Sequence, residues 1–126
     1  MTRINCVPPS ELTREHLIAE YRELPRVFGM VYGAVERGAT DPTIMDIPPT
    51  YRMGKGHMKF FADKLGYLVK RQKALIAEMR SRGYDPRFPN PEKLLVDIPE
   101  VFHGDWEPDE EALRISRARI EERLNG

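Results

Sequence analysis

The chain has 126 residues, of which 40% are apolar, and its 20 basic side chains balance its 20 acidic ones. This length suits one domain around a single modest core, so a second domain is not expected. No apolar run approaches the roughly 20 residues that a bilayer span needs, and no secretory signal pattern opens the chain. We therefore expect a protein that works inside the cell, away from membranes. Cys6 is the only cysteine, which excludes an intrachain disulfide and a multi-cysteine metal site. It is expected to be a small buried thiol, and the alternative is a nucleophile.

The neutral net charge hides an uneven distribution. Residues 1–49 hold five basic and seven acidic side chains, residues 50–83 hold nine and two, and residues 84–126 hold six and eleven. The middle of the chain therefore carries +7, and the two ends carry −2 and −5. Such a segment indicates either a face for a polyanion or a solvated helix surface, and charge alone does not separate the two.

The first predicted helix has Ser10 as its N-cap and reaches Gly38. Pro25 interrupts it, because proline has no N–H and its ring crowds the carbonyl four residues earlier, that of Tyr21. We expect a kink at Glu23 and the residue after it, which frees a backbone carbonyl and lifts Glu23 out of a regular packed surface. The apolar residues that recur at helical spacing are Leu17, Tyr21, Leu24, Phe28, Val31 and Val35.

A long loop is predicted over residues 39–56, which are rich in proline, glycine and aspartate. The longest periodic segment follows at residues 57–82 and predicts a second helix that stops at Gly83. Its expected inward face consists of Phe61, Leu65, Leu68, Leu75 and Met79.

Residues 84–108 contain five prolines and no sustained period, so they are predicted to be irregular, with a helical turn at 92–95. Pro108 suits the first turn of a last helix. Its expected inward residues are Leu113, Ile120 and Leu124. No segment alternates at period two. The predicted fold class is all-α: one compact domain, residues 1–126, with three main helices joined by irregular loops.

Two short patterns leave their chemistry open. His16, Glu20 and Glu23 lie at i, i+4 and i+7, which suits either a metal ion or a solvated, hydrogen-bonded cluster, and no second histidine is placed to complete a site. The run Met53-Gly54-Lys55-Gly56-His57 indicates either a phosphate-binding loop or a simple turn.

Arg22 and Arg26 lie four residues apart and share a helix face, with Arg3 nearby if the N-terminal segment folds back on that helix. Arginine's planar fork suits bidentate contact with phosphate. Pairing with the glutamates of the same helix, Glu15, Glu20 or Glu23, is the alternative.

Several blocks of the sequence together resemble one family. They are Met1-Thr2-Arg3-Ile4-Asn5, residues 16–29, Gly56-His57, Phe60-Phe61, Asp63-Lys64-Leu65, Lys70-Arg71-Gln72, Asp97-Ile98-Pro99 and Gly104-Asp105. In this order they resemble the phage endonuclease V type pyrimidine-dimer DNA glycosylases over nearly the whole chain. The resemblance implies a helical monomer without metal or organic cofactor. It also implies binding of damaged duplex DNA, cleavage of the glycosidic bond of a pyrimidine dimer, and backbone cleavage as an abasic-site lyase.

The resemblance also implies the catalytic groups. The nucleophile is the α-amine of Thr2 after removal of Met1, and the carboxylate beside it is Glu23. An α-amine has a pKa of about 7.7 to 8.0 against about 10.4 for lysine, so more of it is the free amine near neutral pH. Its attack on the anomeric carbon of the sugar expels the base and forms an iminium, which allows β-elimination.

The DNA contacts that the resemblance implies are phosphate-binding and lesion-clamping arginines, a histidine at the edge of the site and a glutamine near the lesion. The residues are Arg3, His16, Arg22, Arg26, Gln72, Arg119 and Arg123. The family is known for extruding the base opposite the lesion, but the sequence shows no pocket for that base.

Three features depart from the phage-type pattern. Glu15 replaces a neutral residue, Tyr32-Gly33-Ala34 replace basic ones, and the chain ends at Gly126 without an aromatic and basic tail. Fewer phosphate contacts lower both affinity and its salt dependence, so weaker non-specific DNA binding is expected. Three other functions remain open: a lyase or glycosylase for other base damage, a non-catalytic DNA-binding module of the same fold, and a metal-dependent hydrolase using His16, Glu20 and Glu23.

Overall fold

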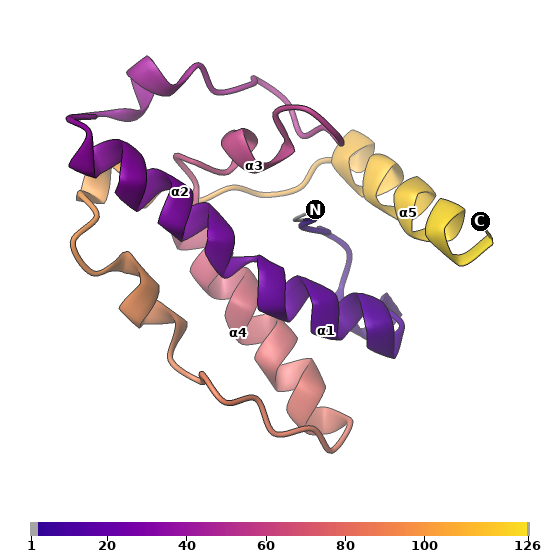
Figure 1. Ribbon diagram of the computed structural model, residues 1–126. Helices are drawn as coiled ribbons and strands as arrows, with labels where there is room; N and C mark the ends of the chain where they lie inside the picture. Colours follow the sequence, from indigo (N-terminus) through magenta and orange to yellow (C-terminus); the bar gives the residue numbers. More distant parts are fainter. Residues whose placement is uncertain (1–2, 126) are drawn as a thin grey trace.

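The first predicted helix forms as two helices that meet at Leu24. In the computed structural model, which describes residues 3–125, α1 spans Arg14–Glu23 and α2 spans Pro25–Glu36. Pro25 is the first residue of α2, so the predicted break lies where the proline removes a backbone donor. Figure 1 shows the change of direction between α1 and α2.

The predicted N-cap at Ser10 is wrong. Ser10 lies in a short 3-10 turn, η1, Pro9–Glu11, and the cap of α1 is Thr13, whose hydroxyl accepts a hydrogen bond from the backbone N–H of His16 at 3.2 Å. The reason is local, because Pro9 starts the 3-10 turn and leaves Thr13 as the hydroxyl next to the first free helical N–H groups.

The second predicted helix is also divided, into α3 (His57–Phe60) and α4 (Leu65–Ser81). Gly104 lies against the break: its N–H donates to the carbonyl of Asp63, and its carbonyl accepts from the N–H of Tyr67, both at 3.1 Å. A Cβ atom on Gly104 would stand 2.3 Å from the Asp63 carbonyl oxygen, so only glycine allows this approach. The periodic pattern across residues 57–82 cannot show that a segment 40 residues later replaces its helical hydrogen bonds.

The end of α4 is as predicted. Gly83 has a φ of +89°, and the N–H of Tyr84 donates to the carbonyl of Met79 at 2.8 Å, which closes the helix. The segment after it is irregular apart from η3 (Pro91–Leu95), at the predicted turn, and η4 (Glu100–Phe102). The long loop before α3 holds one further 3-10 turn, η2, Pro42–Met45.

The last helix, α5, spans Glu110–Asn125 and begins two residues after Pro108, with the Asp109 carboxylate accepting from the N–H of Ala112 at 2.8 Å. Its predicted inward face is partly wrong. Leu113 and Ile120 are half-buried, but Leu124 is 58% exposed, and the most buried residues are Ala112 and Ser116. Small residues let α5 approach the N-terminal segment, residues 3–7, closely: the N–H of Cys6 donates to the Ser116 hydroxyl at 3.2 Å.

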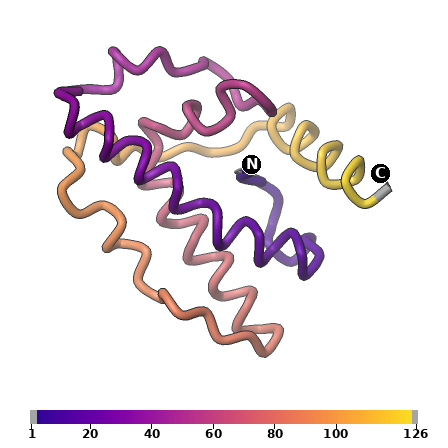
Figure 2. Tube along the Cα trace, in the orientation of Figure 1, coloured from indigo at the N-terminus to yellow at the C-terminus, as the bar shows by residue number. Residues whose placement is uncertain are grey.

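One hydrophobic cluster runs from Ile4 to Ala112, and no strand occurs within residues 3–125, so the all-α single-domain fold is confirmed. Cys6 lies in this cluster as the predicted buried thiol. The N-terminal segment runs through the core beside α1, α4 and α5 (Figures 1 and 2). Among the described residues, no helix has the length and apolar character needed to cross a membrane.

Candidate functional site

The N-terminal segment is held at Ile4 by two hydrogen bonds. The backbone N–H of Ile4 donates to Nε2 of His57, and the hydroxyl of Tyr51 donates to the carbonyl of Ile4, both at 2.8 Å. All three residues are buried. Burial raises the pKa of Tyr51, so the hydroxyl keeps the proton that it donates. The chain therefore leaves Ile4 toward Arg3 in one fixed direction.

His57 links this segment to the loop before α3. A backbone N–H can only donate, so Nε2 is the unprotonated nitrogen, and Nδ1 carries the proton that it donates to the carbonyl of Arg52 at 2.7 Å. Burial lowers the pKa of His57, and the charge of Arg3 acts in the same direction. The ring is thus neutral near pH 7 and satisfied on both sides.

Arg3 lies near charged residues of both α1 and α5. Burial lowers the pKa of Arg3, and repulsion from Arg119 and Arg123 of α5 adds to this effect, while attraction to Glu23 opposes it. Such effects require the four side chains to share one region of the protein. The structure therefore gathers four of the residues predicted for the site, from the N-terminal segment, α1 and α5.

Glu23 is the last residue of α1, immediately before the break. Its side chain is 21% exposed, and one carboxylate oxygen lies 4.0 Å from Nη1 of Arg26. Leu24, which joins α1 to α2, keeps helical dihedral angles of φ −53° and ψ −41°, so Glu23 lies at the junction of two helices that follow one another directly.

The other predicted DNA-contacting residues of the N-terminal and C-terminal helices lie on α1, α2 and α5. Arg22 and Arg26 are exposed at the end of α1 and the start of α2, and His16 is half-buried two turns before Glu23. On α5, Arg123 is exposed, and Arg119 lies 3.1 Å from the carboxylate of Glu122. Thr2, the predicted nucleophile, lies outside the described residues.

Gln72 supplies a hydrogen-bond partner at the break between α1 and α2. Its side-chain amide donates to the carbonyl of Tyr21 at 2.9 Å, which is the carbonyl that Pro25 leaves without a helical partner. The freed carbonyl was predicted from the sequence, but its partner was not. The other amide atom of Gln72, Oε1, is buried and has no hydrogen-bond partner among the described residues.

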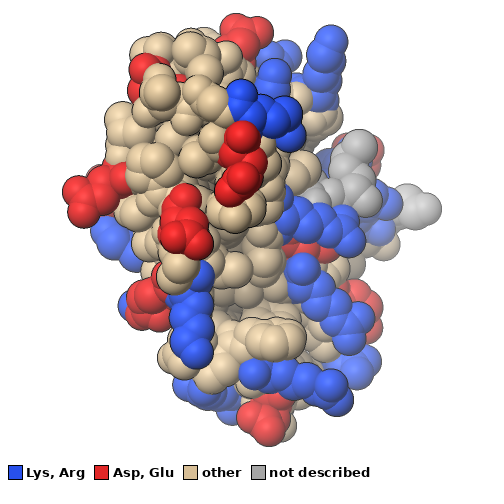
Figure 3. Space-filling view, turned by 60° about the vertical axis from the view of Figure 1, so that its left-hand side comes forward, with Lys and Arg blue, Asp and Glu red and all other residues tan. Residues whose placement is uncertain are grey.

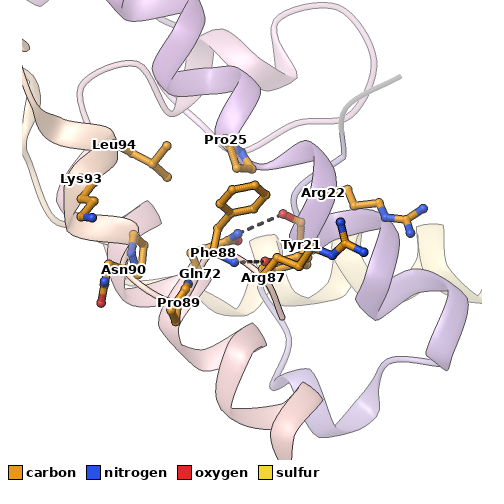
Figure 4. Close-up of a pocket in the computed structure, with 11 residues that line it drawn as sticks. Tyr21, Arg22, Pro25, Gln72, Arg87, Phe88, Pro89, Asn90, Lys93 and Leu94 are labelled. Carbon is orange, nitrogen blue, oxygen red and sulfur yellow. Dashed lines mark hydrogen bonds between the residues drawn. The ribbon is translucent and has the colours of Figure 1, made fainter. Parts of the chain in front are cut away.

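A pocket of about 540 Å³ opens beside Gln72, between the helix break and the segment before η3. Figure 4 shows the ring of Phe88 pointing toward Pro25, while Arg22 and Arg87 lie on one side of it. The backbone N–H of Phe88 is held by the hydroxyl of Tyr21 at 3.1 Å. An exposed aromatic ring beside basic groups suits a planar aromatic ligand that carries negative charge nearby.

Glu20 belongs to the core and not to an open cluster with His16 and Glu23. It is 1% exposed, its carboxylate accepts from Nε and Nη2 of Arg71 at 2.7 and 3.1 Å, and the Asn5 amide donates to it at 3.0 Å. Burial lowers the pKa of Arg71, but the charge of Glu20 outweighs it, and the net pKa is raised. The predicted solvated cluster is therefore wrong. No group of three or more potential metal-ligating side chains occurs in the part of the chain that the structure describes.

A family model described as pyrimidine dimer DNA glycosylase matches residues 1–90. The chain belongs to this family. The matched range contains the N-terminal segment and α1 to α4, and therefore Arg3, Glu23 and most of the lining of the pocket beside Gln72. Arg119 and Arg123 lie beyond the match, and only the folded chain brings them to the same site.

Membership makes the protein a DNA glycosylase of DNA repair, with DNA as its substrate. The predicted +7 segment is nevertheless not one DNA-facing surface. On and beside α4, Lys64, Lys70, Arg71, Lys73 and Arg82 form ion pairs within the protein. Figure 3 shows Lys and Arg gathered along the right-hand side of that view, with Asp and Glu mostly to the left.

The sequence did not reveal the residues that hold and complete the site. Tyr51 and His57 fix Ile4 from positions about 50 residues away, and no pattern connects them. Phe88 had a weak signal, since it is the only aromatic residue between Tyr84 and Phe102 in a segment with many prolines. An aromatic residue that a proline-rich irregular segment leaves outside the core is a candidate for ligand contact.

Proposed function

We propose that this glycosylase uses the α-amine of Thr2 as its nucleophile and Glu23 as its catalytic carboxylate, and that it also acts as an abasic-site lyase. The amine attacks the anomeric carbon of the damaged nucleotide, and the bond to the base breaks with its electron pair leaving on the base. The amine loses a proton as the sugar ring opens and an iminium forms. Loss of the C2′ proton then expels the 3′ phosphate, and water releases the cleaved strand from the enzyme.

The observation that carries the proposal is that Glu23 lies near enough to Arg3 for its charge to oppose the lowering of the Arg3 pKa. Thr2 directly precedes Arg3 in the sequence, and Ile4 is held by His57 and Tyr51, so we propose that the amine acts in the region of Glu23. Arg119 and Arg123 add positive charge around Arg3, which favours the neutral, nucleophilic form of an adjacent amine.

Glu23 is suited to two parts of the reaction. Its negative charge stabilises the iminium, and its partial exposure lets it reach a bound sugar and accept the C2′ proton. Arg22, Arg26, Arg119 and Arg123 then hold the phosphates on either side, with His16 at the edge of the site.

The pocket beside Gln72 is proposed to receive the extruded base opposite the lesion. Its volume of about 540 Å³ is ample for one base, and Phe88 offers a stacking surface. Gln72 supports the wall of the pocket, because its side-chain amide holds the carbonyl of Tyr21.

Borohydride trapping on a duplex with one abasic site tests the mechanism. Native protein with Met1 removed, as verified by intact mass, is expected to form a stable adduct whose modified peptide begins at Thr2. The matched control is the same protein with its α-amine blocked, which is expected to bind the duplex without forming the adduct. No adduct under conditions of demonstrable binding would instead support the non-catalytic module, and an adduct on a lysine would overturn the role of Thr2.

A further inference from the structure

A second, basic hollow shares no lining residue with the pocket beside Gln72. It has a volume of about 600 Å³ and is enclosed by α2 and the loop before α3. We call it the 46–59 hollow. Its lining residues include Met30, Asp46, Arg52, Lys55, His57 and Lys59. Three permanent cations thus share the hollow with a single carboxylate.

These three cations differ from those of α4. Within residues 3–125, no ion pair involves Arg52, Lys55 or Lys59, whereas Lys70 and Lys73 are paired with Asp105 and Glu92. Three cations that share a hollow with one carboxylate repel one another, and an anionic ligand relieves that repulsion. The unpaired charge of the basic segment is therefore concentrated at the 46–59 hollow.

The hollow is rigidly connected to the N-terminal segment. The carbonyl of Arg52 accepts from Nδ1 of His57, whose Nε2 accepts from Ile4. Gly56 has a φ of +87°, and a Cβ there would lie only 3.1 Å from Cγ of Pro48, so glycine lets the loop pack closely at this point. Arg52 is thus held in a defined position relative to Ile4, two residues from the proposed nucleophile.

The hollow also lies along the face of α2 that carries Arg26, three residues after Glu23. Met30, in its lining, is one turn after Arg26, or about 6 Å farther along the helix axis. Successive base pairs of B-DNA are about 3.4 Å apart, so this distance corresponds to roughly two base steps. A DNA strand that passes Glu23 and Arg26 would bring a flanking phosphate to the hollow.

We propose that the 46–59 hollow binds a backbone phosphate of the DNA strand flanking the lesion, through Arg52, Lys55 and Lys59. The location of this contact rests on the proposed placement of the reacting nucleotide at Glu23. The contact is independent of base sequence and adds to the salt-dependent part of binding. Its lysines come from the 46–59 hollow, because α2 itself contains no lysine.

The test is the affinity for a duplex that contains an uncleavable tetrahydrofuran abasic analogue, measured at several salt concentrations. The variant K55A/K59A is expected to lower the slope of log Kobs against log salt by up to about 1.8, and to weaken binding about tenfold or more at 0.1 M salt. The matched control is K70A/K73A, which removes two lysines that are already ion-paired and should leave the slope nearly unchanged.

A second measurement locates the phosphate. Neutral methylphosphonate linkages are placed one at a time along each flank of the analogue. Native protein should lose affinity at one or two flanking positions where K55A/K59A no longer responds, and both proteins should respond alike elsewhere. An equal response at every position, or the same change of slope in K70A/K73A, would overturn the proposal. These binding measurements need no chemistry, so they fail independently of the borohydride test on native protein.

Discussion

Nε2 of His57 accepts a hydrogen bond from the backbone N–H of Ile4, and the two residues are 53 positions apart in the sequence. The bond places the histidine as a support for the N-terminal segment, without any contact of its own with the reacting atoms. Its removal is expected to act on the position of the α-amine more than on DNA binding.

Replacing His57 by Ala should lower the single-turnover rate of imine trapping at saturating DNA by about tenfold to a hundredfold, since a displacement of about 1 Å has effects of this size. His57→Gln keeps an acceptor near the Nε2 position and should restore most of the rate. Hydrogen exchange at the Ile4 amide should quicken in His57→Ala and stay slow in His57→Gln. Equal trapping rates in native protein and His57→Ala would contradict this role.

Protonation of His57 is expected to make the stability of the protein depend on pH. Burial lowers the pKa of His57 in the folded protein below its unfolded value of about 6.5, so on acidification the unfolded chain binds the proton first. Stability should be constant above about pH 7 and decrease as the pH falls below about 6.5. Urea unfolding of native protein and His57→Gln between pH 5 and 7.5 checks this, because the glutamine variant should lose less stability over that range.

Glu23→Gln should stop elimination while preserving binding. Loss of a general base lowers a rate by about a hundredfold to ten-thousandfold, and loss of one negative charge beside Arg26 should leave DNA affinity unchanged or slightly higher. Strand cleavage and affinity are measured on the same abasic duplex. Glu15→Gln is the control, since it removes an exposed carboxylate of the same helix and should cleave normally. Undiminished cleavage by Glu23→Gln would exclude its catalytic role.

Breaking the buried pair of Glu20 and Arg71 should destabilise the protein strongly. Glu20→Gln leaves a buried guanidinium without its counter-charge, for which about 3 to 5 kcal/mol of unfolding free energy is expected. Glu11→Gln, which breaks the exposed pair with Arg117, should barely shift the urea midpoint. If Glu20→Gln instead kept full stability and lost a chelator-sensitive activity, the metal-dependent hydrolase would return as an explanation.

Phe88→Ala tests the pocket beside Gln72. The side chain is 78% exposed, so stability should not change, but affinity for damaged duplex should fall about tenfold, as expected for one lost stacking contact. Val101→Ala truncates another exposed apolar residue, outside the pocket, and should bind like native protein. Similar affinities for Phe88→Ala and native protein would mean that no base stacks there.

Local chemistry explains the parts of the fold that were predictable. Pro25 lacks a donor, so the helix break follows from one residue and its neighbours, and Gly83 ends α4 because only glycine readily adopts a φ of +89°. Glu23 could therefore be identified as an unusual position, with a role that came from the resemblance. The same local reasoning failed at residues 61–64, where Gly104 supplies the hydrogen bonds that a continuous helix would have made.

By itself, then, the sequence determined the helical class, the break at Pro25 and the family to which the chain is similar. Tertiary structure alone decided that Glu20 is buried against Arg71, and that Arg3, Glu23, Arg119 and Arg123 share one region. The physical reason is that a charged side chain has the same local sequence signature whether it is solvated or buried. Its partner, which decides between the two, lies far along the chain and is brought near only when the core forms.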